Sequence, residues 1–223
     1  MKKKILSVCL VAVIAVMAIT GASLAYFTDV DTNTNVVTMG DVDIALDEAP
    51  VSYDDATYTY TADENADRVK SNTYDNVYPG AVLPKDPTVH NNGTMDAYVR
   101  VKITVDFNYL ALLQDDDIIF NKGEWDADLR NILNIDTQNW TYAGLEFAND
   151  GTQNVNFYYT YNTKLAAGAD TTPVFTQVTV PVSFDKELDN AASRTFNIDL
   201  EAHAIQVPGF ADADAAWTAF DAE

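Results

Sequence analysis

Hydrophobic and polar positions alternate along much of the chain with a period of two, which is typical of half-buried β-strands. The clearest run covers residues 97–105, where alanine, valine and isoleucine alternate with tyrosine, arginine, lysine and threonine. Similar runs cover residues 36–46, 58–60, 155–161, 178–184 and 195–204. Pro181 lies on the outward side of its run and has no backbone N–H, which predicts an edge strand there.

Two short segments have helical periodicity instead. In residues 124–133 the apolar face is formed by Trp125, Leu129, Ile132 and Leu133. In residues 212–220 it is formed by Ala213, Ala216, Trp217 and Phe220. Residues 109–114 predict one or two further helical turns, and the polar stretches 62–80 and 162–173 predict loops. The pattern as a whole predicts an all-β fold, a two-sheet sandwich with short helical insertions and a short C-terminal helix.

The N-terminal segment has the features of a secretory signal peptide over residues 1–25. Three lysines precede an apolar run over residues 5–20, and Ser23 and Ala25 are the small residues that a signal peptidase requires. The apolar run is short for a membrane span. The sequence therefore predicts cleavage between Ala25 and Tyr26 and a mature protein that is secreted from the cytoplasm.

Acidic side chains dominate what remains after cleavage. The signal peptide holds three of the 13 basic residues and none of the 34 acidic ones, so the mature chain has a net charge of about −24. Such a chain is repelled by nucleic acids and by anionic membranes, and neither is an expected partner. Cys9, the one cysteine, leaves with the signal, so the mature protein has no disulfide.

Catalytic motifs are missing from the sequence. His90 and His203 are the only histidines, no His-Glu-x-x-His is present, and a zinc site would have to combine both histidines with a carboxylate from across the fold. No cysteine nucleophile survives processing, and no Gly-x-Ser-x-Gly elbow or Gly-rich phosphate loop occurs. We predict no catalytic, cofactor-binding or metal-binding residue and no enzyme activity. The acidic triplet at residues 115–117 favours a solvated loop over a calcium site.

Tyrosines gather in an otherwise polar region before the run at residue 97. They are Tyr53, Tyr58, Tyr60, Tyr74 and Tyr78. Exposed tyrosines there would form an adhesive or inter-subunit surface. The alternative is that the rings pack down on a strand and leave only their hydroxyl groups in water.

Three stretches resemble the TasA/camelysin family of secreted Gram-positive matrix proteins. The first is the signal junction with residues 25–44, including Ala25-Tyr-Phe-Thr-Asp29. The second runs from Tyr78-Pro-Gly80 through residues 87–94 to 96–102. The third is Glu201-Ala-His-Ala-Ile-Gln206 with Gly209-Phe210 and Trp217. Residues 107–194 are less characteristic.

The resemblance implies a jelly-roll-like sandwich over residues 36–223 that polymerises head to tail into biofilm-matrix fibres without a cofactor. It also implies that residues 26–35 act as a donor segment, completing a sheet of the next subunit through Tyr26, Phe27, Thr28, Asp29 and Val30. A donated strand pairs with the free backbone N–H and C=O groups of a sheet edge. Head-to-tail contacts of this kind do not form a closed ring, so each added subunit lengthens a filament. Expected partners are other copies of the chain, a signal peptidase during export and an accessory matrix subunit. The alternatives are a monomeric surface adhesion module and a secreted camelysin-like metallopeptidase.

Overall fold

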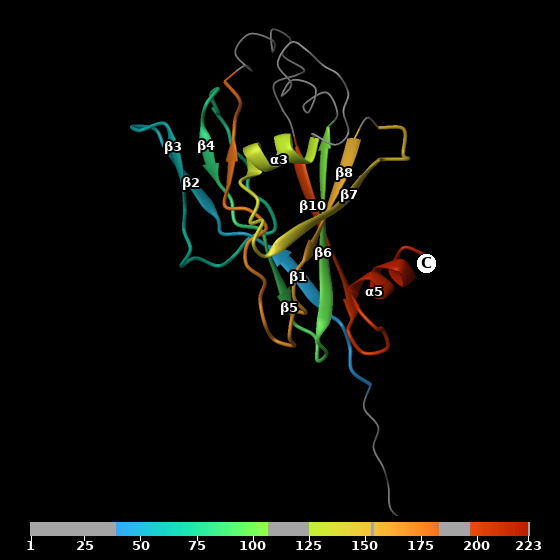
Figure 1. Ribbon diagram of the computed structural model, residues 1–223. Helices are drawn as coiled ribbons and strands as arrows, with labels where there is room; N and C mark the ends of the chain where they lie inside the picture. Colours follow the sequence, from blue (N-terminus) through green and yellow to red (C-terminus); the bar gives the residue numbers. More distant parts are fainter. Residues whose placement is uncertain (1–38, 107–124, 153, 183–196, 223) are drawn as a thin grey trace, which may run out of the picture. The chain divides into compact units, whose positions relative to one another are not determined.

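The computed structural model describes residues 39–106, 125–152, 154–182 and 197–222 (Figure 1). The chain divides into two compact units, residues 1–39 and 40–223, and the description below concerns the second. Its elements in chain order are β1 (Ile44–Asp47), β2 (Val51–Asp54), β3 (Thr59–Ala62), β4 (Val82–Pro84), β5 (Thr88–Asn91), β6 (Ala97–Asp106), α3 (Trp125–Leu133), β7 (Trp140–Phe147), β8 (Asn154–Tyr161), β9 (Gln177–Thr179), β10 (Ile198–Gln206) and α5 (Ala213–Phe220).

The largest sheet is antiparallel and has the strand order β10-β6-β8-β7. Its register aligns Leu200, Ile103 and Phe157 across three strands, so these side chains lie on one face. That face carries the alternating apolar residues of β6 and β8, which are almost completely buried. β10 and β7 are the edge strands, and a register shift at Tyr142/Gly144 interrupts the pairing of β7 with β8.

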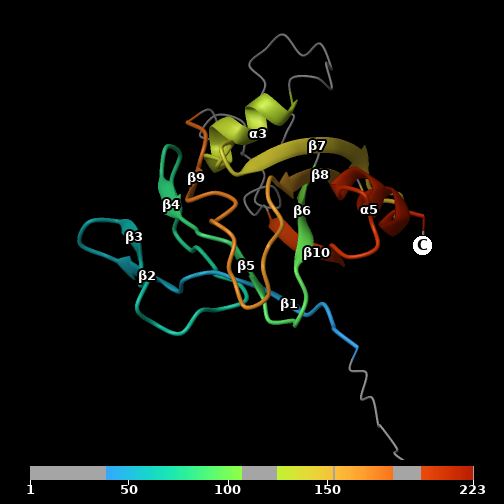
Figure 2. The same cartoon turned by 60° about the horizontal axis from the view of Figure 1, so that its bottom comes forward.

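A second layer covers the inner face of this sheet. Residues 81–91, with β4 and β5, run antiparallel to residues 169–180, with β9, through backbone hydrogen bonds along the whole stretch. β1 pairs with the other side of β5. Val89 of β5, Leu83 of β4 and Leu129 of α3 share one hydrophobic core with β6 and β8. Figures 1 and 2 show both layers, with α3 beside β9.

The outer face of the large sheet is partly covered by α5. Asp212 caps this helix by accepting a hydrogen bond from the Ala215 N–H at 2.8 Å. Arg100 of β6 and His203 of β10 are opposite each other on the outer face and both contact α5, His203 through a stacked contact with Phe220. The four-stranded sheet therefore has apolar contacts on both faces.

Much of this fold agrees with the sequence-based prediction. The all-β sandwich-like class, the strands β6, β8 and β10 and the helices α3 and α5 are confirmed. Of the predicted run at 36–46, residues 36–38 lie outside the described part, residues 39–43 form no strand, and β1 covers the rest and one further residue. Of the run at 178–184, β9 includes residues 178 and 179, and residues 180–182 form no strand. Pro181 therefore follows an edge strand instead of lying inside one. The predicted turn at 109–114 lies outside the described residues.

No helix in the described ranges is long and apolar enough to cross a membrane.

Candidate functional site: a groove beside a sheet edge

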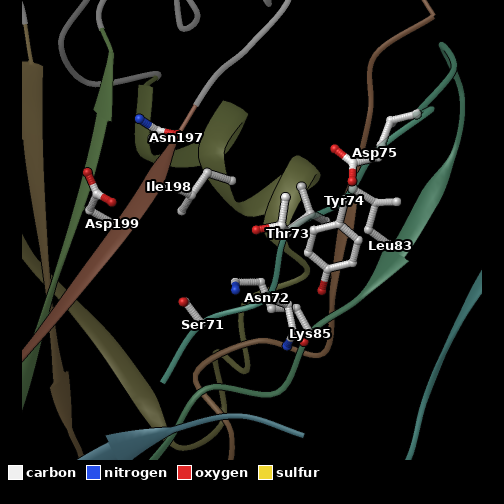
Figure 3. Close-up of a pocket in the computed structure, with 12 residues that line it drawn as sticks. Ser71, Asn72, Thr73, Tyr74, Asp75, Leu83, Lys85, Asn197, Ile198 and Asp199 are labelled. Atoms are coloured by element: carbon white, nitrogen blue, oxygen red, sulfur yellow. The ribbon is translucent and has the colours of Figure 1, made fainter. Parts of the chain in front are cut away.

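A groove lies along the edge of the large sheet, between β10 and the segment 71–75 (Figure 3). Its main cavity has a volume of about 400 Å³. A second cavity of about 170 Å³ shares Ser71, Lys85, Ile198 and Asp199 with the first and extends to Leu200. Residues at the start of β10 line both cavities, and residues of β1 also line the smaller one.

The sheet edge that borders this groove is unpaired within the described residues. β10 pairs with β6 on one side, and no described strand pairs with its other side. Its inward side chains, Ile198 and Leu200, are only half-buried, although the residues opposite them on β6 are completely buried. In Figure 3 the Ile198 side chain points toward the cavity. An unpaired strand with a half-covered apolar face is a template for another extended chain.

The wall opposite β10 is fixed by buried polar contacts. Glu48 accepts a hydrogen bond from the Asn72 N–H at 2.8 Å, and its other carboxylate oxygen lies 2.5 Å from Lys85 Nζ. The Tyr74 hydroxyl donates to the Pro84 carbonyl at 2.5 Å, and burial raises the pKa of this phenol. The segment 71–75 is therefore held at a fixed position along the groove, although it contains no strand or helix.

A charged network joins β1, β5 and two loops next to the smaller cavity. The Arg68 guanidinium bridges Asp47 at 2.5 Å and Asp86 at 2.8 Å. The His90 ring lies between two carboxylates, 2.8 Å from Asp47 and 2.6 Å from Asp170. Burial opposes charge on the imidazole, but the hydrogen bonds to both carboxylates outweigh it and raise the pKa of His90. Burial likewise opposes the charge of Asp47, but Arg68 and His90 lower its pKa overall.

These contacts predict a pH-dependent stability that depends on His90. Because the folded-state pKa lies above the ordinary value of 6.5, the stabilisation is complete below about pH 6.5 and is lost as pH rises through the folded-state pKa. Urea unfolding between acidic and alkaline pH should show this decline in the wild type and a flatter profile in His90→Gln. His203→Gln serves as the control and should keep the wild-type profile, whereas parallel profiles for the wild type and His90→Gln would contradict the prediction.

Neither histidine has a free nitrogen for zinc. Both ring nitrogens of His90 face carboxylates, and those of His203 face Glu201 at 3.0 Å and Arg100 at 3.3 Å. Within the described ranges, no group of three or more histidine, cysteine, aspartate or glutamate side chains has the arrangement of a metal site. These residues do not fit a catalytic zinc ion, which requires three side-chain ligands around an open position.

The residues predicted from sequence to act in assembly lie outside the described part of the chain. They are the cleavage pair Ala25 and Tyr26 and the donor residues Phe27, Thr28, Asp29 and Val30. The acidic triplet at 115–117 also lies outside it. The groove itself was missed by sequence reasoning, because its walls come from segments more than one hundred residues apart. The alternation in β10 indicated a strand but not that its outer edge is unpaired.

Comparison with known proteins places this chain in a family. A family model described as camelysin metallo-endopeptidase matches residues 1–136. Neither a curated protein nor a solved structure matches the chain. The family match covers more than half of the 223 residues and extends from the predicted signal peptide through β6 and α3. On this evidence, which confirms the resemblance seen in the sequence, the chain belongs to the camelysin family.

Proposed function

We propose that this protein is a secreted structural subunit of extracellular matrix fibres, which assembles by strand donation. In this proposal the segment 26–35 of one copy lies in the groove of the next copy and adds a strand to the free edge of β10. The observation that supports it best is that the outer edge of β10, which no strand of the described ranges pairs with, lies beside a groove with a half-buried apolar wall. Membership of the camelysin family supports a protein of the cell surface or its surroundings.

Strand addition suits the chemistry of this edge. Backbone N–H and C=O groups of the donor would pair with those of β10, and alternate donor side chains would enter the groove. Five extended residues span about 17 Å, a length comparable with half of the nine-residue β10. In an extended donor, Tyr26, Thr28 and Val30 lie on one side and Phe27 and Asp29 on the other. We propose that Tyr26 and Val30 cover Ile198 and Leu200. The donor thus supplies a pairing strand for β10 and an apolar cover for its half-buried side chains.

The test is electron microscopy of the chain 26–223 beside a truncation that begins at Val36, concentrated in the same buffer. We expect fibres from the first chain and none from the second, because the truncated chain keeps the groove but has lost the donor. Fibres from the truncation would refute donation by residues 26–35. Dispersed monomers in both samples would favour a monomeric adhesion module instead.

A matched pair of substitutions tests the acceptor. Leu200 and Leu145 are both partly buried against the core, and they lie on the two edge strands of the same sheet, β10 and β7. Leu200→Gln should abolish or strongly reduce fibres, because it places an amide in the groove. Leu145→Gln removes the same apolar surface from the opposite edge and should leave fibres intact. Equal effects of the two substitutions would show that β10 is not the acceptor.

A further inference from the structure

Exposed apolar side chains gather around one pocket that is separate from the groove. In the described ranges, six large hydrophobic or aromatic side chains are exposed, and Tyr58, Tyr78 and Val82 among them line the same cavity. A fourth, Val182, lies beside Gly80 in the wall of that cavity. Such clustering marks an interaction site, since isolated exposed apolar residues need no explanation but a contiguous patch does.

Tyrosine rings form the walls of this cavity, which has a volume of about 210 Å³ between β3 and the segment 76–83. Tyr60 is fixed in place, because its ring centroid lies 4.9 Å from those of Tyr53 and Tyr74 and its hydroxyl donates to the Asp75 carbonyl at 2.6 Å. Tyr58 and Tyr78 are more exposed and stand at the cavity mouth. Three tyrosines, of which Tyr60 is held by its neighbours, are therefore among the residues that line the space.

The backbone at this pocket is strained. Tyr58 has φ of 59° and Asn76 has φ of 56°, and both line the cavity. They are two of only three non-glycine residues with positive φ in the described part of the chain. Asparagine adopts this conformation readily, but a bulky side chain such as that of Tyr58 rarely does, and such strain concentrates at binding sites. The Tyr58 N–H donates to the Asp54 carbonyl at 2.8 Å, which fixes the backbone of the turn from which this ring projects.

Negative charge surrounds the pocket. Asp55 lies in the turn that carries Tyr58, and Asp54 ends the strand before it. The residues that line the cavity are themselves uncharged. The pKa of Tyr53 is raised, first by burial and then by Asp55 and by the phenols of the neighbouring tyrosines, so these groups lie close together. The chain as a whole carries a net charge of −21. A cation is attracted to this site and an anion is repelled from it.

We propose that this tyrosine-walled pocket binds the quaternary ammonium group of a choline-type cation. Aromatic faces attract such a cation through the ring quadrupole, and several rings around one cavity are the arrangement that recognises it. Its methyl groups would contact Val77 and Val82 as well as the rings. A quaternary ammonium needs no hydrogen-bond acceptor, which suits walls made of ring faces and aliphatic side chains.

Saturation-transfer NMR on the secreted chain tests this with choline as the probe, because the method works for dispersed protein and for fibres. We expect saturable transfer to the choline methyl groups with a dissociation constant in the millimolar range. The uncharged isostere 3,3-dimethylbutan-1-ol should bind roughly tenfold more weakly. No transfer to choline, or equal binding of the isostere, would overturn the proposal.

Substitutions identify the site. Tyr58→Ala should weaken choline binding several-fold, whereas Tyr58→Phe keeps the ring face and should bind as the wild type does. Asp55→Asn should also weaken binding, because Asp55 lies in the same turn as Tyr58. Asp43→Asn removes an exposed carboxylate that belongs neither to this turn nor to the cavity lining, and it should not weaken binding. Circular dichroism of each variant confirms folding. Unchanged binding in folded Tyr58→Ala would place the choline elsewhere and refute the assignment.

Discussion

Replacing Lys85 with methionine is expected to lower the free energy of unfolding by about 3–5 kcal/mol. Lys85 Nζ lies 2.5 Å from Glu48 Oε2, and the side chains are only 11% and 4% exposed. Methionine has a similar length, so the substitution removes the charge and leaves little empty space. The Glu48 carboxylate then stays buried with the Asn72 N–H as its remaining partner among the contacts described here. Urea unfolding followed by circular dichroism measures the loss.

Two further variants separate the buried charge from other effects. In the double variant Glu48→Gln with Lys85→Met, the amide still accepts from the Asn72 N–H and no charge is left unpaired, so most of the lost stability should return. Lys164→Met breaks a comparable ion pair with Asp96, but these side chains are 61% and 36% exposed, and we expect a change below about 1 kcal/mol. A similar loss in both single variants would show that burial of the pair does not matter.

The same ion pair links stability to the proposed assembly. Glu48 joins the end of β1 to Asn72, and Lys85 lines both cavities of the groove. If the segment 71–75 moves when Glu48 loses its partner, the groove widens and donor binding weakens. We therefore expect the single variant Lys85→Met to form fewer fibres than the double variant, even under conditions in which both are folded.

The strands of the core could be predicted from sequence because one face of each strand is buried and the other faces outward. Val99, Val101 and Ile103 face the core and the residues between them face outward, so the period of two is visible in the sequence. β7 was missed because Gly144 and the register shift interrupt its alternation. β4 and β5 were missed because they are short, and β5 is buried at three of its four positions, which removes the alternation.

The candidate sites depend on contacts that no local pattern reveals. From the sequence, His90 was considered only as a candidate zinc ligand. In the structure it bridges Asp47 and Asp170, which are 43 and 80 positions away along the chain. The tyrosine-rich region was visible in the sequence. In the structure the Tyr60 ring packs against those of Tyr53 and Tyr74, and Tyr58 is exposed, but an adhesive or inter-subunit role for the exposed rings stays a prediction. The turn at Tyr58 decides that the ring of Tyr58 is the exposed one. This turn requires a positive φ, which residue propensities do not predict for a tyrosine.

Replacing Arg100 with alanine is the second change with a large expected effect, a loss of about 2–4 kcal/mol in the free energy of unfolding. The guanidinium binds both carboxylate oxygens of Asp221, at 3.0 and 2.6 Å. It also lies 4.6 Å from the ring centroid of Trp217, 4.9 Å from that of Tyr158 and 5.4 Å from that of Phe220. Alanine removes all of these contacts, of which those with Trp217, Phe220 and Asp221 join β6 to α5 and its C-cap residue.

The loss should be concentrated in the C-terminal helix. Hydrogen exchange measured by mass spectrometry should show faster exchange over residues 213–222 in Arg100→Ala, with β6 and β8 still protected, because the opposite face of the sheet keeps its core. Lys102→Ala is the matched control: it lies on the same face of β6 and pairs with Glu201, which is 57% exposed, so the change should stay below about 1 kcal/mol. Uniformly faster exchange across both layers in Arg100→Ala would instead mean that α5 and the sandwich unfold as one cooperative unit. Local release is the outcome that the geometry favours, since α5 packs on the outer face of the sheet and Arg100 provides a charged part of that contact.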